Sequence, residues 1–512
     1  MARGQGLHLG HLFDKEINNF SSAPSVYEHE RHAVLFGPSG SGKFTRFVSV
    51  NLLSDCLNDR SVIVWDPKGE AAAVTAWHRA NALGHEVKII DPFGKLREAI
   101  EHFPEHREMI DAGLADSVGF NPLDVLHPLD PLDPGTEEKP NPNRNFYDDA
   151  AALAEALINT EGSTEQHWPE SAQGLVVGLL MWEKLLNQDD ANLENVRTML
   201  TQDDLSEWVD KYENGKLARD EAGNAVKEWK QTRGLNITAE RMVKAGNTQG
   251  PKGLFDIGGY EIASLAQRFQ RPTDEIVSIR STADTQTRWL LSKSMRDDLT
   301  SKSAIKFGRL KEKLTTVYVI LPAERLRTHS AWLRLVLVSA LRALYRPGGL
   351  PVTMLIDEMA TLGRLRPLED AFGLVRGYGV QLVGILQDLG QLKALYGERW
   401  ESFLANAGLV QGLTPNDMTT AEWMSRRAGE WTIWAKGIGE SSGGRSDADR
   451  DSTNWSQVQV RRMPAFEMFG MERGTGLAWI AGLADTVKFK TPNYWHLREC
   501  AARAGRNPYA GD

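Results

Sequence analysis

The chain has 512 residues and a net charge of −9, and 41% of its residues are hydrophobic while 25% are charged. This composition is typical of a globular protein, and it excludes nucleic-acid binding through overall charge, so such binding would need a local basic surface or channel. Cys56 and Cys500 are the two cysteines, which excludes a disulfide framework or a cysteine-based metal site. No run approaches the ~18 apolar residues of a membrane helix. We therefore expect a cytoplasmic protein without a transmembrane segment.

Short apolar runs recur along the chain, and each is followed by a turn and a helical pattern. The runs hardly alternate between apolar and polar residues, which is typical of strands buried on both faces of a parallel sheet. We therefore predict an α/β fold with a mostly parallel central sheet flanked by helices. The predicted strands are 32–36, 61–65, 86–90, 315–322, 352–356, 380–386 and 408–413.

This alternation of strands and helices is interrupted in the middle of the chain, where helix formers dominate. The predicted helices there are 148–160, 171–186, 192–201, 261–270 and 284–299. We therefore predict an all-α insertion domain over 151–300 that divides the sheet domain into 1–150 and 301–512. Two polar segments, 127–145 and 436–454, are predicted to be loops, and the second is expected to be mobile.

A phosphate-binding loop is predicted at "GPSGSGKFT", residues 37–45, between the predicted strand 32–36 and a helical pattern. Glycines let backbone N–H groups face phosphate oxygens, and the helix after the loop favours an anion at its N-terminus. Lys43 would reach the terminal phosphates. A glycine-rich turn with an exposed lysine is the alternative interpretation. The predicted nucleotide contacts are Gly37, Pro38, Ser39, Gly40, Ser41, Gly42, Lys43, Phe44 and Thr45.

Phe44 departs from the full motif, in which a Ser or Thr after the lysine places its hydroxyl on Mg²⁺. Thr45 is the remaining hydroxyl candidate for the metal, but it lies about 100° further around the helix. Thr45 can therefore serve as a metal ligand only after a local change in the helix. Otherwise water fills the coordination position or the affinity for the metal falls.

A second carboxylate element follows the predicted strand 352–356, which ends at Asp357 and Glu358. Ligands of open parallel sheets collect at the carboxyl ends of the strands. Asp357 is therefore the predicted metal ligand, and Glu358 is predicted to orient and deprotonate an attacking water. A solvated acidic pair at a strand end is the alternative.

The strand 380–386 is flanked by two further candidate catalytic residues. Gln387 follows it, and a neutral amide there can sense the γ-phosphate, although an ordinary polar residue at a helix start is the alternative. Arg376 precedes the strand in the turn "RGYG". An arginine supplied across a subunit interface accelerates phosphoryl transfer by roughly 10³–10⁵. Arg376 is our candidate for that role, and a structural salt bridge is the alternative.

Taken in order, these motifs resemble those of one family, the TraG-type coupling proteins of conjugation and type IV secretion. The resemblance covers most of the chain, and the run from 376 to 398 is its most specific part. In the family's "DPKGE" element, Asp66, Lys68, Gly69 and Glu70 are in place. The other matching runs are "GPSGSGKFT", "GFNPLD" (119–124), "LIDEMATLGRL" (355–365), "RGYGVQLVGILQDLGQLKALYGE" (376–398) and "LTPNDMTTAEWMSRRAGEWT" (413–432).

The resemblance implies a RecA-like P-loop ATPase that uses ATP and Mg²⁺ and is a hexamer when active, with a monomer in solution as the alternative. Such a motor or gate delivers single-stranded DNA with its relaxase, or effector proteins, to the type IV secretion channel at the inner membrane. The all-α insertion would receive these substrates. The resemblance also implies nucleotide contacts over 37–45, metal and water roles for Asp357 and Glu358, and a sensing role for Gln387.

Because the sequence departs from the family at two points, functions other than an ATP-driven motor are also considered. Phe44 replaces a small residue, and the family's N-terminal membrane anchor is absent from this sequence, so we expect at most peripheral association with the inner membrane face. The alternative function is a nucleotide-binding adaptor that recruits substrates with little or no hydrolysis. A chromosome-pumping relative is disfavoured by the specific runs quoted above. Candidate basic residues for a pore or interface lie in 302–313 and at Arg364 and Arg366, and a solvated face is the alternative for them.

Overall fold

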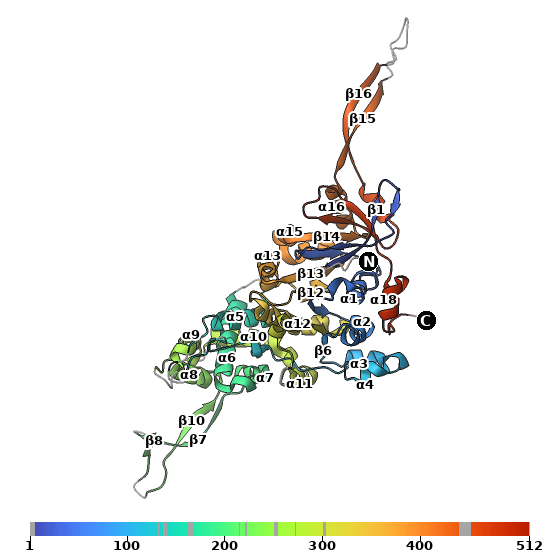
Figure 1. The fold of residues 1–512 in the computed structure, drawn as a ribbon. Helices are drawn as coiled ribbons and strands as arrows, with labels where there is room; N and C mark the ends of the chain where they lie inside the picture. The colour runs from blue at the N-terminus through green and yellow to red at the C-terminus, as the bar shows by residue number, and fades with distance from the viewer. Residues whose placement is uncertain are drawn as a thin grey trace.

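A twelve-stranded sheet forms the body of the molecule (Figure 1). The computed structural model describes residues 6–131, 133–136, 139, 141–160, 167–213, 216–220, 223–249, 254–271, 273–300, 304–439 and 452–510. The strands of the sheet are β1 (Leu7–Asp14), β2 (Asn19–Phe20), β3 (Ser25–Tyr27), β4 (His32–Phe36), β5 (Ser61–Trp65), β6 (Glu86–Ile90), β11 (Thr315–Val319), β12 (Val352–Ile356), β13 (Val380–Leu386), β14 (Ala407–Leu413), β17 (Thr475–Ile480) and β18 (Val487–Lys490).

Seven of these strands run parallel in the order β14-β4-β13-β12-β5-β11-β6. They are the seven strands that the sequence predicts, so the mostly parallel sheet is confirmed. An antiparallel extension continues beyond β14, in which β17, β18 and β1 pair in turn, and these strands were not among those predicted. Because β4 lies between β14 and β13, the loop after β4 is central to the carboxyl edge of the sheet.

Helices cover both faces of the sheet, and alternate residues of each strand point into two separate cores. Within β4, for example, Val34 and Phe36 enter one core, which contains α12, whereas Ala33 and Leu35 enter the other, which contains α2. The helices of the sheet domain are α1 (Ser49–Leu53), α2 (Glu70–Asn81), α3 (Lys95–Ile100), α4 (Arg107–Asp111), α12 (Leu326–Leu344), α13 (Arg366–Leu374), α14 (Leu389–Tyr396), α15 (Trp400–Asn406), α16 (Met418–Ala428), α17 (Ala465–Phe469) and α18 (Arg498–Arg503).

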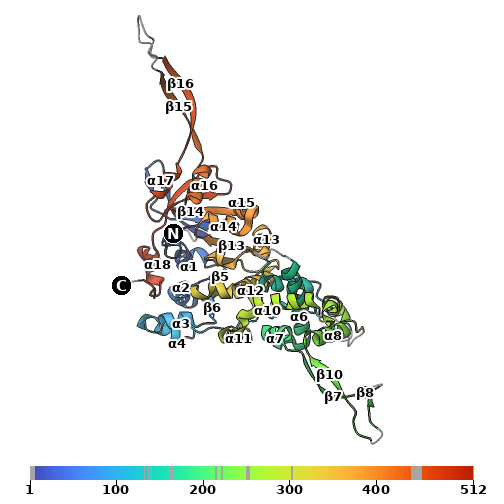
Figure 2. The ribbon, with the colours of Figure 1, turned by 180° about the vertical axis from the view of Figure 1, so that it is seen from behind.

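A helical lobe lies beside the sheet and is formed by the middle of the chain (Figure 2). Its helices are α5 (Phe146–Leu157), α6 (His167–Asn187), α7 (Leu193–Thr201), α8 (Leu235–Gly246), α9 (Gly259–Ala266), α10 (Asp274–Thr287) and α11 (Lys293–Thr300). The expectation that this region is exclusively helical is wrong, because β7 (Leu205–Asp210) and β10 (Lys227–Arg233) form an antiparallel ribbon, extended by the short pair β8 (Tyr212–Glu213) and β9 (Lys216–Leu217). The predicted limits of the insertion domain, 151–300, stay a prediction.

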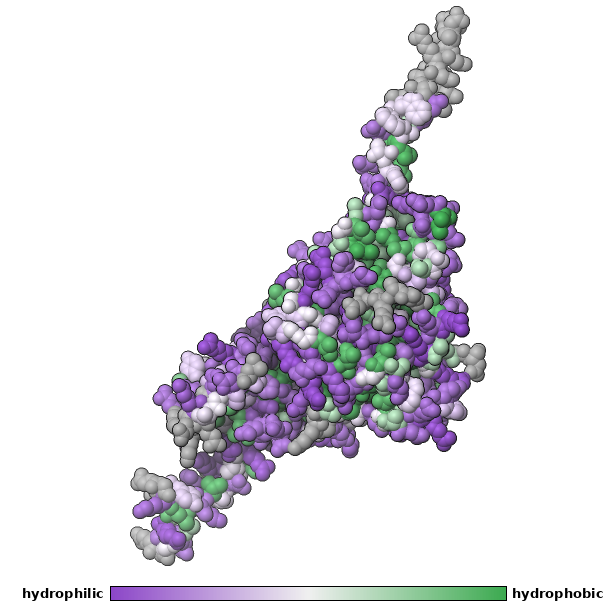
Figure 3. Space-filling model, in the orientation of Figure 1, coloured by the Kyte–Doolittle hydropathy of each residue, from purple (hydrophilic) through white to green (hydrophobic). Residues whose placement is uncertain are grey.

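A second ribbon corrects the predicted loop 436–454. β15 (Glu430–Gly439) and β16 (Ser452–Arg461) pair antiparallel along their whole length and project from the body, so residues at both ends of the predicted loop are strand residues. The expected mobility falls on 440–451, outside the described residues. The ribbon exposes large side chains, among them Trp434 at 62% and Trp455 at 57%. In the space-filling view the ribbon extends away from the body (Figure 3).

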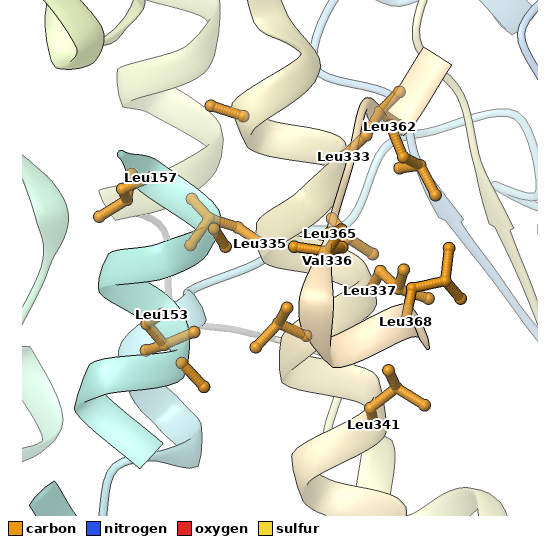
Figure 4. Close-up of a cluster of buried hydrophobic side chains, with 14 of the residues drawn as sticks. Leu153, Leu157, Leu333, Leu335, Val336, Leu337, Leu341, Leu362, Leu365 and Leu368 are labelled. Atoms are coloured by element: carbon orange, nitrogen blue, oxygen red, sulfur yellow. The ribbon is translucent and has the colours of Figure 1, made fainter. Parts of the chain in front are cut away.

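Helix α12 connects the helical lobe to the sheet. Figure 4 shows its leucines between Leu153 and Leu157 of α5 on one side and Leu362, Leu365 and Leu368 on the other. Leu362, Leu365 and Leu368 come shortly after Asp357 and Glu358 in the chain. Helix α12 therefore contacts both the helical lobe and the sheet domain. Within the described residues, no helix combines the length and the apolar character that crossing a bilayer requires.

Candidate active site

The phosphate loop follows β4 at the centre of the sheet edge. The amide of Gly37 donates to the carbonyl of Leu386, the last residue of β13, at 3.0 Å. Gly40 and Gly42 adopt φ angles of 75° and 90°, which glycine accepts without strain. The hydroxyl oxygen of Ser41 is buried and has no hydrogen-bond partner among the described residues. A buried hydroxyl without a partner fits a loop built to surround a polar ligand such as a phosphate.

Lys43 is buried, with 8% of its surface exposed, although lysine is rarely buried unless it is paired. Its ammonium group donates to the carbonyl of Gly37 at 2.9 Å and lies 3.4 Å from a carboxylate oxygen of Glu358. The structure therefore brings together two predicted site residues that are far apart in the sequence.

Glu358 is held in an unusual backbone conformation, with φ 52° and ψ 47°. This left-handed region costs a non-glycine residue of order 1 kcal/mol, and such strain gathers at functional sites. The side-chain amide of Gln387 donates to the second carboxylate oxygen of Glu358 at 3.1 Å. Lys43, Glu358 and Gln387 thus form one bonded chain across the ends of β4, β12 and β13.

Asp357 lies next to Glu358 and faces the neighbouring strand β5. Because Ile356 pairs with Trp65, Asp357 and Asp66 follow neighbouring strands at the same level. Burial, with a contribution from the charge of Glu358, raises the pKa of Asp357 to about 6. Burial also raises the pKa of Asp66 to about 7, and the charges of Glu70 and Asp357 add to that shift. Three carboxyl groups, those of Asp66, Glu70 and Asp357, therefore lie within electrostatic range of one another.

This carboxylate group fits Mg²⁺ held together with a nucleotide. Mg²⁺ is usually bound through one or two carboxylates, waters and substrate phosphates rather than in an all-protein cage. The described residues contain no cluster of three or more metal-ligating side chains arranged around a point. Burial is the main cause of the raised pKa of Asp357, the charge of Lys43 offsets it in part, and a divalent cation bound there would favour the ionised form further.

Phe44 and Thr45 contact the C-terminal part of the chain. The ring of Phe44 meets that of Tyr494 edge to face, with centroids 6.4 Å apart. The hydroxyl of Thr45 donates to the side-chain oxygen of Asn493 at 2.8 Å. The hydroxyl of Thr45, the predicted hydroxyl ligand of the metal, is thus hydrogen-bonded to Asn493, and residues 43–48 form a π-helical turn.

Arg376 lies at the opposite edge of the sheet from the phosphate loop. Its charge acts on His32, the first residue of β4, whose pKa is lowered to about 4 mainly by burial and further by Arg376 and Arg31. The seven residues of β13 separate Arg376 from Gln387, which corresponds to roughly 20 Å at ~3.3 Å per residue. Arg376 therefore does not contact the phosphate loop of its own chain.

Sequence reasoning missed the contacts between the loop region and the last quarter of the chain. The guanidinium of Arg473 donates to the carbonyl of Gly40, and that of Arg46 donates to the carbonyl of Thr491 at 2.5 Å. These contacts depend on β17 and β18, whose place in the sheet no local pattern reveals. Asp66 was the one detectable omission, because it ends an apolar strand as Asp357 does.

The basic residues considered for a pore or interface are only partly compatible with that role. Lys311 is buried and donates to the carbonyls of Gly348 and Tyr378, so it is a structural residue. Lys313 pairs with Glu86 at 2.9 Å. Residues 302 and 303 lie outside the described residues.

A model of the family described as "Type IV secretory system Conjugative DNA transfer" matches residues 5–102 and 123–507. The chain belongs to this family. The conjugal transfer protein TraG of Escherichia coli is 25% identical over 486 residues, which are 89% of this chain, and the chain spans 63% of the length of that protein. The coupling protein VirD4 of Bartonella henselae is 24% identical over 438 residues, 83% of this chain and 60% of VirD4. The resemblance to TraG-type coupling proteins is thus confirmed.

The plasmid coupling protein TrwB, solved in complex with ADP and Mg²⁺, has the same fold. It aligns with a TM-score of 0.56 at 16% identity and covers 92% of this chain and 87% of its own. This likeness confirms the predicted fold, that of a RecA-like P-loop NTPase.

Proposed function

We propose that this chain is an ATP-hydrolysing coupling protein, a motor or gate that recruits substrates to a type IV secretion channel. The observation that carries the proposal is the bonded chain of Lys43, Glu358 and Gln387 at the carboxyl edge of the sheet. Within this unit, the ammonium group of Lys43 is proposed to bind phosphate, Glu358 to act as the general base, and Gln387 to supply the neutral amide.

In the proposed reaction the loop 37–43 binds the phosphates of ATP through its backbone N–H groups. Lys43 exchanges Gly37 and Glu358 for phosphate oxygens, which frees the carboxylate of Glu358 to orient a water and accept its proton. Gln387, still bonded to Glu358, changes position with the γ-phosphate and passes that change to α14. Mg²⁺, held with Asp357, supplies positive charge against the phosphates.

We propose that Arg376 acts in the site of a neighbouring subunit, because it lies too far from the loop of its own chain. This role requires a ring, and we propose the hexamer of the family. Lys43→Ala and Arg376→Ala should each be inactive, but a mixture should regain turnover, since some sites then join an intact loop to an intact arginine. A mixture that co-assembles and stays inactive contradicts the trans arrangement.

The proposed substrates are single-stranded DNA with its relaxase, or effector proteins, received by the helical lobe. Membership of the family, and the relatives named for conjugal transfer and type IV secretion coupling, support this choice. We propose peripheral association with the inner membrane through channel components.

The test compares binding of a fluorescent ATP analogue with release of inorganic phosphate over a series of protein concentrations, with and without single-stranded DNA. We expect phosphate release that rises with both, and loss of substrate transfer in cells carrying Lys43→Ala. Tight binding without release in any condition contradicts the motor. That result would instead support the adaptor, which the hydrogen bond of the Thr45 hydroxyl to Asn493 favours, because it occupies the hydroxyl that would otherwise be available to the metal.

A further inference from the structure

The C-terminal segment 491–509, which we call the C-terminal clasp, crosses the start of the helix after Lys43. The carbonyl of Thr491 accepts from Arg46, and the side chains of Asn493 and Tyr494 contact Thr45 and Phe44. Each of the three residues after Lys43 therefore has a partner in this one segment.

The clasp is docked firmly on the sheet domain between these contacts and its end. Tyr494 and Cys500 form a small core with Val50, Leu53 and Val74, which belong to α1 and α2. Backbone contacts support this packing, because the amide of Gly505 donates to the carbonyl of Val74 at 2.8 Å. The clasp is thus an integral part of the fold and not a loosely attached tail.

The end of the clasp reaches Glu70, the first residue of α2. The side-chain amide of Asn507 donates to Glu70 at 2.6 Å, and Asn507 is buried. Its side-chain oxygen accepts from the amide of Tyr509 at 2.9 Å, so the amide group must present its N–H to the carboxylate. The hydroxyl of Tyr509 donates to the carbonyl of Lys68 at 2.7 Å.

Glu70 connects these contacts to the active site. Its charge reaches Asp66 and Asp357, which follow the neighbouring strands β5 and β12. Burial raises the pKa of Glu70, whereas the hydrogen bond from Asn507 and the charge of Lys68 favour its ionised form. Glu70 then adds negative potential on the side of Asp357 where Mg²⁺ is proposed to bind.

We propose that the C-terminal clasp positions Glu70 beside Asp357 and that Asn507 is the residue through which it does so. This inference rests on the proposed function, because it assigns Asn507 and Glu70 as positioning residues of the same nucleotide site. It also accounts for Phe44. The bulky ring after Lys43 anchors the clasp to the phosphate loop. One segment therefore contacts both the loop and Glu70 at the start of α2, and holds them at a fixed separation.

The test is a Mg²⁺ titration of the binding of a fluorescent ADP analogue to the full chain. Asn507→Ala should raise the Mg²⁺ concentration for half-maximal binding about tenfold, as expected for a residue that orients a metal site from outside it. Binding without Mg²⁺ should stay unchanged. Arg506→Ala is the matched control, since Arg506 pairs with Glu105 at 2.9 Å and lies over Phe103, away from the carboxylates. It should shift the midpoint by less than about twofold.

A double-mutant cycle separates positioning from general loosening of the fold. Asn507→Ala combined with Glu70→Gln should shift the midpoint no further than Glu70→Gln alone, because both changes remove the same contact. If Asn507→Ala does not fold, Tyr509→Phe removes the exposed contact to Lys68 and should shift the midpoint in the same direction. Equal effects of Asn507→Ala and Arg506→Ala, or full additivity in the cycle, would overturn the proposal.

The readout also distinguishes this proposal from the proposed function. If the variants show the expected shifts in the Mg²⁺ midpoint but the wild type releases no phosphate, ATP hydrolysis is contradicted. The proposal that the clasp positions Glu70 is then still supported. A flat wild-type titration, without Mg²⁺-dependent nucleotide binding, overturns both.

Discussion

Phe44 departs from the phosphate-loop motif, and its structural role is explained by contacts with a distant part of the chain. The ring is partly buried and packs against two hydrophobic clusters, one of which contains Tyr494. From the motif alone, Phe44 threatened to crowd Mg²⁺. The ring packs on the side of the C-terminal clasp, so we predict that it does not crowd the metal.

Phe44→Ala should therefore destabilise the protein without raising its turnover. Removing a partly buried aromatic ring and leaving a cavity costs about 2 kcal/mol, at the lower end for a phenylalanine because the site is not fully closed. Urea unfolding and phosphate release on the same preparation check both expectations. Faster turnover at unchanged stability would show that the ring does crowd the metal.

His8 in β1 makes stability depend on pH. Burial, with His11 adding to it, lowers the pKa of His8 to about 4, whereas an unfolded histidine has a pKa near 6.5. The unfolded state therefore binds more protons between these values, so the contribution of His8 is complete above pH 6.5 and is lost as the pH falls. At pH 5 the loss is about 2 kcal/mol.

His8→Leu should flatten this dependence. The drop in the melting temperature between pH 7.5 and pH 5 should be smaller in the variant than in the wild type, because the variant lacks the histidine that takes up a proton on unfolding. The other titratable groups contribute equally to both proteins, so their effects cancel in the comparison. Parallel curves for the two proteins would show that His8 is not held neutral by the fold.

At the scale of elements, Arg79 joins helix α2 to its neighbours. It is fully buried, and its guanidinium donates to the hydroxyl of Thr316 in β11 at 2.7 Å and to the carbonyls of Leu52 and Leu57 at 3.3 and 3.1 Å. In the sequence it reads as an ordinary surface arginine of a helix. Its role depends on carbonyls left free where α1 ends, which only the tertiary structure reveals.

Arg79→Ala should cost about 3 kcal/mol or more, because it leaves a cavity and several buried acceptors without a donor. Arg97→Ala is the control, since Arg97 is 45% exposed and pairs with Asp116 on the surface, and its loss should cost no more than about 0.5 kcal/mol. The two unfolding midpoints in urea compare them directly. Equal midpoints would contradict the structural role of Arg79.

The elements also show what sequence reasoning can reach. The seven parallel strands were predictable because burial on both faces gives each a continuous apolar run, and Asp357, Glu358 and Gln387 were predictable as residues that follow such runs. β15 and β16 were missed, although residues 430–433 and 457–460 alternate as strands do, because the polar segment between them was interpreted as a loop. The left-handed backbone of Glu358 and the contacts of Asn493 and Asn507 arise only from tertiary packing.

On the scale of the whole molecule, the site and the helical lobe share one packing unit. Helix α12 lies between α5 and residues 362–368, which come just after Glu358 in the chain (Figure 4). Close-packed cores respond to small displacements as a unit. We therefore propose that a change in the position of Glu358 on hydrolysis reaches the lobe through α12, whereas Arg376, at the other end of β13, is proposed to act in a neighbouring subunit.

The central claim is that the bonded chain of Lys43, Glu358 and Gln387 is a hydrolytic centre. The most direct test measures phosphate release and nucleotide affinity together for the wild type and Glu358→Gln. We expect the variant to bind ATP at least as tightly and to release phosphate at least about 100-fold more slowly, because the amide cannot accept the proton of the attacking water. Phosphate release at the wild-type rate by Glu358→Gln would contradict the account.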